Sequence, residues 1–176
     1  MTRIRFGTDG WRGIIAADYT FDAVRACAEG FALYLEEEGV RRGVVVGYDT
    51  RFAAEDFALA AAEVLCAHEI PVFLTPHPTP TPVVAHGILQ LGADGAVVIT
   101  ASHNPWRWLG FKVRPSYGGS APPPVLQRIE ALIPPAEEWT RIPRLRQDEA
   151  RRHGLLEDFD PTPGYMRHVE GLLDME

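Results

Sequence analysis

The sequence has few cysteines and a shortage of positive charge. It contains two cysteines, Cys27 and Cys66, both within helix-like segments. Their spacing fits neither a disulfide framework nor a zinc site, which favours two buried free thiols over a metal-binding pair of Cys66 and His68. With 17 Lys and Arg against 24 Asp and Glu, the formal net charge is -7. A general nucleic-acid binder needs clustered cations to displace counterions, so we expect no nucleic-acid partner.

Long apolar runs are also missing. No run approaches the roughly 18 residues of a membrane span, and the start MTRIRFGTDGWRG lacks the apolar core of a secretory signal. We therefore expect a cytoplasmic protein that does not associate with membranes. The composition, 46% hydrophobic and 23% charged with 16 Gly and 15 Pro, is typical of a globular protein with many turns. The length of 176 residues is near that of one principal domain.

Hydrophobic periodicity predicts alternating helices and strands. From Thr20 to Glu38 apolar residues recur every three or four positions, with Thr20 as the N-cap and Gly39 just past the end. Short apolar runs typical of buried strands occupy 43–48, 70–74 and 95–100, and further helices are expected at 54–68, 82–91 and 122–133. The alternation predicts an α/β fold, a three-layer α/β/α sandwich around a mostly parallel or mixed sheet.

Three loops follow predicted strands and begin at Asp49, Thr75 and Ala101. The second, TPHPTPTP, is too rich in proline for a helix interior or a central strand. The third is expected to run over 101–110, before a short strand GFKV. In open α/β sheets ligands gather beyond the carboxyl ends of the strands, so we expect the three loops to converge on one site.

The end of the sequence has a different character. Prolines punctuate residues 134–163, which lack sustained apolar periodicity, so we expect a linker on the surface after a principal domain of residues 1–133. Residues 164–176 regain helical spacing, which predicts a helix leading toward an absent second domain. The only D-x-D pair, Asp158 and Asp160, precedes a proline, which favours a turn over a metal site.

The segment TASHNP, Thr100 to Pro105, carries the strongest chemical signal. A serine in a loop at the end of a buried strand is placed where its hydroxyl can face a ligand, although a lone serine can equally cap a turn. The string ITASHNP resembles the active-site serine loop of the α-D-phosphohexomutases, the phosphoglucomutase and phosphomannomutase family. Four further motifs match that family in order: FGTDGWRG, VVVGYDTR, PTPTP and GFKV.

The resemblance runs from about Arg3 to about Ile133, and the sequence of this region is most similar to bacterial phosphoglucomutases. In that family these residues form the first of four domains, which implies that domains 2 to 4 of the same polypeptide are this chain's missing partners. The implied activity is that of an intramolecular phosphotransferase, an isomerase. It interconverts hexose 1-phosphate and hexose 6-phosphate through a phosphoserine and a bisphosphorylated sugar, with hexose 1,6-bisphosphate as activator.

The resemblance assigns roles to particular residues. Ser102 is the implied nucleophile and phosphoryl donor, with Arg12 beside the phosphoserine and Lys112 returning its ammonium to the same site. His103 is a candidate general acid or base, but neighbours in an extended segment point to opposite sides, so we expect it to line the site, with a structural role as the alternative. A phosphate-binding role is expected for three more residues, for which capping a turn, shaping the loop or supporting the site is the simpler alternative: Thr8, Asn104 and Arg51.

The family also implies Mg²⁺. An oxygen of phosphorylated Ser102 would be one ligand, and the other ligands are absent from this chain. One departure from similar sequences is the run Trp108, Leu109 and Gly110, where Tyr-Asn-Gly is usual. Loss of the amide at Leu109 changes local hydrogen bonding, and substrate preference can differ accordingly.

Two other functions compete with the first domain of a mutase. One is a stand-alone sugar-phosphate-binding or interaction module without mutase activity. The other is a serine hydrolase, which the missing G-x-S-x-G elbow disfavours. A first domain alone is expected to be inactive in turnover of sugar phosphate, because closure of a water-excluded site between domains protects the phosphoserine from hydrolysis. The sequence does not distinguish glucose, mannose and glucosamine phosphates, and it leaves self-association open.

Overall fold

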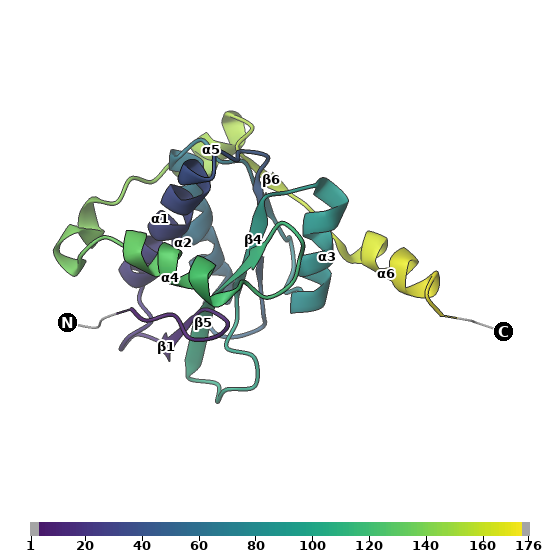
Figure 1. Cartoon of the computed structure of the whole chain (residues 1–176), viewed down its shortest axis with the longest axis horizontal. Helices are drawn as coiled ribbons and strands as arrows, with labels where there is room; N and C mark the ends of the chain where they lie inside the picture. The colour runs from purple at the N-terminus through teal and green to yellow at the C-terminus, as the bar shows by residue number, and fades with distance from the viewer. Residues whose placement is uncertain (1–3, 174–176) are drawn as a thin grey trace.

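A mixed sheet of six strands forms the centre of the molecule (Figure 1). In the computed structural model, which describes residues 4–173, the strand order is β1-β5-β4-β2-β3-β6. Four strands run parallel to one another: β4 (Gly95–Ile99), β2 (Val44–Tyr48), β3 (Val72–Leu74) and β6 (Leu156–Asp158). The other edge is formed by two strands that each run antiparallel to their neighbour: β5 (Trp108–Pro115) and β1 (Trp11–Ile14).

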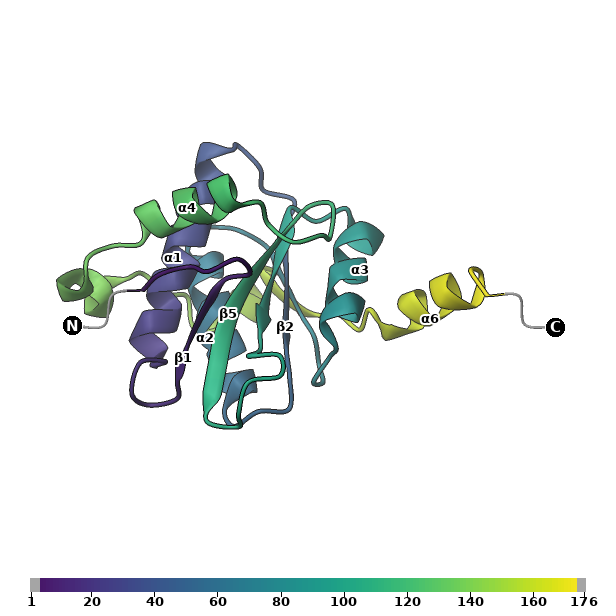
Figure 2. The same cartoon turned by 60° about the horizontal axis from the view of Figure 1, so that its bottom comes forward.

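Helices cover both faces of this sheet (Figures 1 and 2). Val44 and Val46 of β2 pack into the larger core, whereas Val45 packs with Val84 and Ile88 into a smaller one. The larger core is covered by α1 (Phe21–Glu37), α2 (Ala54–Ala67) and α4 (Pro123–Leu132), and the smaller one by α3 (Thr81–Leu91). The predicted α/β/α sandwich is confirmed, and β2 and β4 read as unbroken apolar runs because both of their faces are buried.

The cysteines and the first helix follow the sequence-based expectations. Thr20 caps α1 by accepting a hydrogen bond at Oγ1 from the Ala23 amide, at 3.3 Å. Cys27 and Cys66 are buried free thiols, as predicted. Burial raises the pKa of both thiols, that of Cys66 to about 12. Neither thiol is therefore a ready nucleophile near neutral pH.

The amino-terminal edge of the sheet differs from the prediction. No strand is predicted for residues 11–14, but they form β1 and pair with residues 108–111 of β5. β5 begins at Trp108 rather than at Gly110, so Leu109 is a strand residue and is fully buried. Alternation explains the error: Leu109, Phe111 and Val113 enter the core, while glycine and cations between them hide the strand pattern.

The segment 134–163 is more structured than an irregular linker. It contains a 3₁₀ helix η1 (Ala136–Arg141), a short helix α5 (Gln147–Arg152) and the edge strand β6. β6 pairs in parallel with β3, so this segment extends the sheet of the principal domain. The helix α6 (Thr162–Glu170) follows and points away from the sandwich in both views (Figures 1 and 2). The division into a domain, a linker and a leading helix stays a prediction. No helix among residues 4–173 is long and apolar enough to span a membrane.

Candidate active site

The loops after β2, β3 and β4 surround one cavity of about 750 Å³ at the carboxyl edge of the sheet. Its walls come from residues 49–52, residues 78–81, Thr100, Ser102 and Trp106. The structure thus brings together the three loops that the strand pattern placed at this edge. A cavity of this size suits a small molecule.

Ser102 is exposed at this cavity and has an unusual backbone conformation. Its φ of 56° lies in the left-handed region, which residues with a Cβ adopt at a cost. The Ser102 amide donates to Oγ1 of Thr100 at 3.0 Å, which fixes the turn out of β4. Thr100 therefore holds the backbone of Ser102 in a conformation that exposes the serine hydroxyl to solvent.

His103 lies beside the serine hydroxyl. Its Nδ1 is 3.3 Å from Oγ of Ser102, so the expectation that the two side chains point to opposite sides is wrong. The reason is the left-handed serine, which breaks the alternation of an extended segment. An imidazole at this distance can accept the hydroxyl proton when the oxygen attacks an electrophile.

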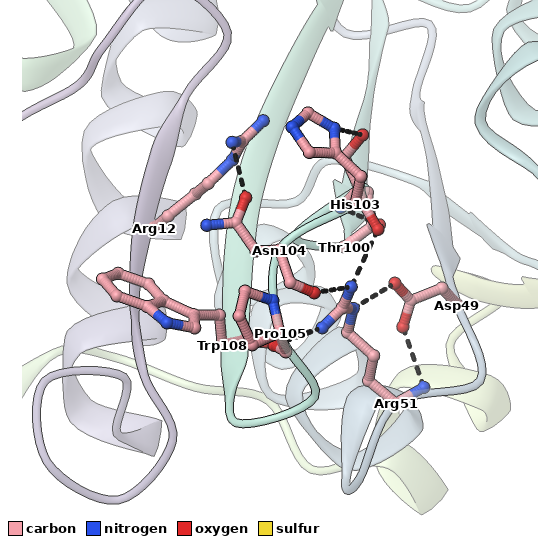
Figure 3. A network of polar contacts seen from close by, with 9 residues as sticks. Arg12, Asp49, Arg51, Thr100, His103, Asn104, Pro105 and Trp108 are labelled. Carbon is pink, nitrogen blue, oxygen red and sulfur yellow. Dashed lines mark hydrogen bonds and ion pairs between the residues drawn. The ribbon is translucent and has the colours of Figure 1, made fainter.

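Arg51 anchors the serine loop from the loop after β2 (Figure 3). Its guanidinium donates to four main-chain carbonyls of that loop: Ser102 and Asn104 at 2.8 Å, Pro105 at 3.0 Å and Trp108 at 3.1 Å. Its Nε donates to Asp49 at 3.1 Å, so all five of its N–H donors are engaged. Arg51 both pairs with Asp49 and supports the loop, and the predicted phosphate contact would require one of these bonds to break.

Arg12 reaches the same loop from β1. Its Nη1 donates to Oδ1 of Asn104 at 2.8 Å (Figure 3). Arg12 is opposite Gly110 on β5, where an added Cβ would lie 3.0 Å from Cγ of Arg12 and 2.9 Å from the Trp11 carbonyl. Glycine at 110 therefore gives Arg12 the room to cross the strand toward the loop. Asn104 joins Arg12 to the segment that carries Ser102.

Lys112 lies beneath the amino-terminal loop in a cluster of charges. It is buried, and its Nζ is 2.6 Å from Oδ2 of Asp9. Nη2 of Arg114 lies 3.3 Å from Oδ1 of the same carboxylate, near enough for an ion pair although not aligned for a hydrogen bond. Thr8, Asp9 and Arg12 line a second cavity of about 290 Å³ next to this cluster.

The predicted residues thus fall into two groups. Ser102 and Arg51 line the larger cavity, and His103 and Asn104 contact them; around the amino-terminal loop are Thr8 and Lys112. Arg12 connects them, because it lines the smaller cavity and binds Asn104. Lys112 is engaged with Asp9, a residue that no sequence pattern singles out as its partner. The sequence signal that could have revealed this pair is the presence of two cations, Lys112 and Arg114, at alternate positions of one strand. Such cations need a carboxylate on a neighbouring segment.

The described residues do not fit a magnesium site of their own. Within residues 4–173, no group of three or more His, Cys, Asp or Glu side chains is arranged to hold a metal ion. Asp158 binds Arg151 at 2.7 Å, and Asp160 accepts from the Thr162 amide at 2.9 Å. Hydrogen bonding from the side chain of Thr162, and then from its amide, lowers the pKa of Asp160. The D-x-D pair therefore belongs to an ion pair and a turn rather than to a metal site.

The fold and site define a class of domain. It is an open α/β sheet with a ligand cavity at its carboxyl edge, an exposed serine beside an imidazole, and basic side chains close by. The chain belongs to the phosphoglucomutase and phosphomannomutase family, since residues 3–139 match the model of its alpha/beta/alpha domain I. The family and the first-domain assignment predicted from the serine loop are confirmed.

Relatives of several names share this domain. A phosphoglucosamine mutase of Desulfotalea psychrophila is 32% identical, over 89% of this chain and 37% of the relative. A phosphoglucomutase of Staphylococcus epidermidis is 38% identical, over 64% of this chain and 21% of the relative. The crystal structure of a putative phosphomannomutase from Thermus thermophilus matches with a TM-score of 0.85 and 36% identity, over 98% of this chain and 37% of that one. The chain spans 21 to 37% of the length of these proteins.

Proposed function

We propose that this chain is the serine-bearing first domain of an enzyme that interconverts hexose 1-phosphate and hexose 6-phosphate. The observation that carries the proposal is the exposed Ser102 hydroxyl at the mouth of a cavity, with Nδ1 of His103 at 3.3 Å. Membership of the family supports it. The relatives' names cover phosphoglucosamine and glucose phosphates. The choice of glucose as the sugar is therefore a narrower proposal than the reaction on hexose phosphates.

The reaction proceeds in two phosphoryl transfers. A sugar hydroxyl attacks the phosphorus of phosphorylated Ser102 and loses its proton, the bond from phosphorus to Oγ breaks, and Oγ takes up a proton as a bisphosphorylated sugar forms. After the sugar reverses its orientation, Oγ of Ser102 attacks the other phosphate and the bond to the sugar oxygen breaks. In this second step His103 Nδ1 accepts the serine proton, and the departing sugar oxygen takes up a proton. The phosphate has then moved along the sugar and the phosphoserine is restored.

Catalysis of such transfers is mainly positioning and neutralisation of charge. Arg12 supplies a cation through its link to Asn104. The cluster of Lys112 and Arg114 around Asp9 adds another, because two cations and one carboxylate leave one net positive charge. The strained, left-handed backbone of Ser102 keeps its hydroxyl oxygen exposed, so the nucleophile is already in position before the substrate binds.

The proposal includes partners outside this chain. Mg²⁺ bound at the phosphoserine would neutralise charge, and its other ligands must come from elsewhere in the enzyme. Hexose 1,6-bisphosphate serves as activator because it phosphorylates the serine. The isolated chain is expected to complete single transfers but no sustained turnover, since its cavity is open to water that competes for the phosphoryl group.

Intact-mass measurement tests the proposal. The chain is incubated with glucose 1,6-bisphosphate and Mg²⁺, and we expect one added phosphoryl group per molecule. Ser102→Ala should show none, whereas Ser116→Ala, which changes another exposed serine, should behave as the unaltered chain. An unmodified chain, or an adduct that survives in Ser102→Ala, would overturn the proposal.

A further inference from the structure

Two exposed aromatic rings flank the Ser102 cavity. Trp106 is 82% exposed and Phe52 is 76% exposed, the highest values among the large apolar residues that the structure describes. Both line the cavity that Ser102 lines. They come from different loops, one after β2 and the other after β4. Large apolar side chains left in water beside a cavity are typical of a ligand-binding surface.

The backbone beneath both rings is held in place. Phe52 directly follows Arg51, whose guanidinium donates to the carbonyls of Asn104 and Pro105 just before Trp106. The Arg51 amide also donates to Oδ1 of Asp49 at 2.9 Å. One side chain therefore ties the two aromatic-bearing loops together. Rings presented on an ordered backbone bind at a lower entropic cost than rings on a loose loop.

The cavity that the two rings line also offers polar groups. The carboxylate of Asp49 and the hydroxyls of Thr81 and Thr100 belong to residues that line it, close to the loop of Ser102. A pyranose ring has C–H groups that pack on aromatic faces and hydroxyls that donate to carboxylates. Apart from a pyranose phosphate, few small anions combine a phosphate with both C–H groups for aromatic faces and hydroxyls for carboxylates.

We propose that Trp106 and Phe52 bind the sugar ring of the phosphosugar, packing on its C–H groups while its phosphate lies at Ser102. The inference rests on the proposed function and adds a sugar-binding role for the first domain. Neither residue takes part in the chemistry. Their effect is on affinity for the sugar, and phosphate alone does not engage them.

Indole N–H resonances of the Ser102→Ala chain provide the test, since this variant binds without reacting. The sequence has four tryptophans, and Trp106→Ala identifies the resonance that belongs to Trp106. We expect glucose 1,6-bisphosphate to shift this resonance and inorganic phosphate to leave it in place. Trp106→Ala and Phe52→Ala should each weaken binding of the bisphosphate about fivefold, and Trp106→Phe less than twofold. Leu89→Ala, an exposed apolar residue of α3, is the matched control and should change nothing.

Three results would overturn the inference: an unmoved Trp106 resonance, an equal response to inorganic phosphate, or the same affinity in Trp106→Ala. An equal loss for both ligands would assign Trp106 to the shape of the loop. These outcomes are separate from those of the proposed function. Failure of Ser102 to take up a phosphoryl group removes the mutase reaction, whereas a silent Trp106 beside a phosphorylated Ser102 removes only the sugar-binding role.

Discussion

The guanidinium of Arg51 donates a 2.8 Å hydrogen bond to the main-chain carbonyl of Ser102. Arg51 lies in the loop after β2, and Ser102 lies in the loop after β4, which is the neighbouring strand. The bond fixes the serine from outside its own loop. Because the guanidinium binds three further carbonyls of the same loop, the position of the nucleophile depends on the planar fork of a single side chain.

Arg51→Lys should therefore destabilise the chain despite keeping the charge. A lysine ammonium has three donors on a point charge and cannot reproduce the five-donor fork. We expect a loss of about 2 kcal/mol in the free energy of unfolding, measured by urea denaturation. Arg144→Lys, which changes an exposed arginine, is the matched control and should shift the value by less than about 0.5 kcal/mol. Equal stability of Arg51→Lys and the unaltered chain would contradict the anchoring role.

Ser102→Gly should be more stable than Ser102→Ala. The φ of 56° at this position costs a residue with a Cβ about 1 kcal/mol that glycine avoids. Both variants lose the hydroxyl, so their difference isolates the backbone. Thermal unfolding of the two variants measures it. If Ser102→Ala proved equally or more stable, the left-handed conformation would carry no strain.

Asp9→Asn should cost more stability than Lys112→Met. Without the carboxylate, Lys112 and Arg114 are both left largely buried and uncompensated, and removal of one partner of a buried pair costs about 3 kcal/mol. Lys112→Met leaves Asp9 paired with Arg114, so its cost is smaller. Urea denaturation of both single variants and the double variant gives the coupling. Additive effects would show that Asp9 and Lys112 do not interact in solution.

His68 should make stability depend on pH. Its Nε2 is 2.8 Å from Glu29 and its Nδ1 is 3.0 Å from Glu36, which also lies 4.0 Å from Arg41. The hydrogen bond with Glu29 is the main cause that raises the pKa of His68 in the folded chain. The stabilisation is therefore fully present below the unfolded pKa of about 6.5 and is lost as pH rises through the higher folded value.

The measurement compares His68→Gln with the unaltered chain by urea denaturation. The variant should be less stable by about 1 to 3 kcal/mol near pH 6, and the gap should narrow as pH rises through the raised folded pKa of His68. His153→Gln, at an exposed histidine, is the control and should show only a small gap. A gap at His68 that widens with rising pH would contradict this account.

The sequence predicts elements well where one periodicity dominates. The helix over residues 21–37 and the strands β2 and β4 have clear patterns, and their bounds differ from the prediction by at most one residue at either end. β1 is different, because its four residues WRGI carry a glycine and an arginine and gain their pairing only from β5. β6 likewise exists through its contact with β3, which no local pattern encodes.

The site shows the same division. Ser102, Arg12 and Lys112 come from motifs; in the structure Arg12 binds Asn104 of the serine loop, and its role beside the phosphoserine stays a prediction. The contact of His103 with Ser102 was missed because it depends on the left-handed backbone conformation of Ser102, which the residue type does not predict. The four carbonyls bound by Arg51 are main-chain atoms and leave no trace in the side-chain sequence.

The central claim is that Ser102 gives its phosphoryl group to a sugar. The direct measurement starts from a chain labelled with radioactive phosphate at Ser102 and adds glucose 6-phosphate. We predict that the label leaves the protein faster than in buffer and appears in bisphosphorylated sugar. Release at an unchanged rate, with all of the label recovered as inorganic phosphate, would contradict the account.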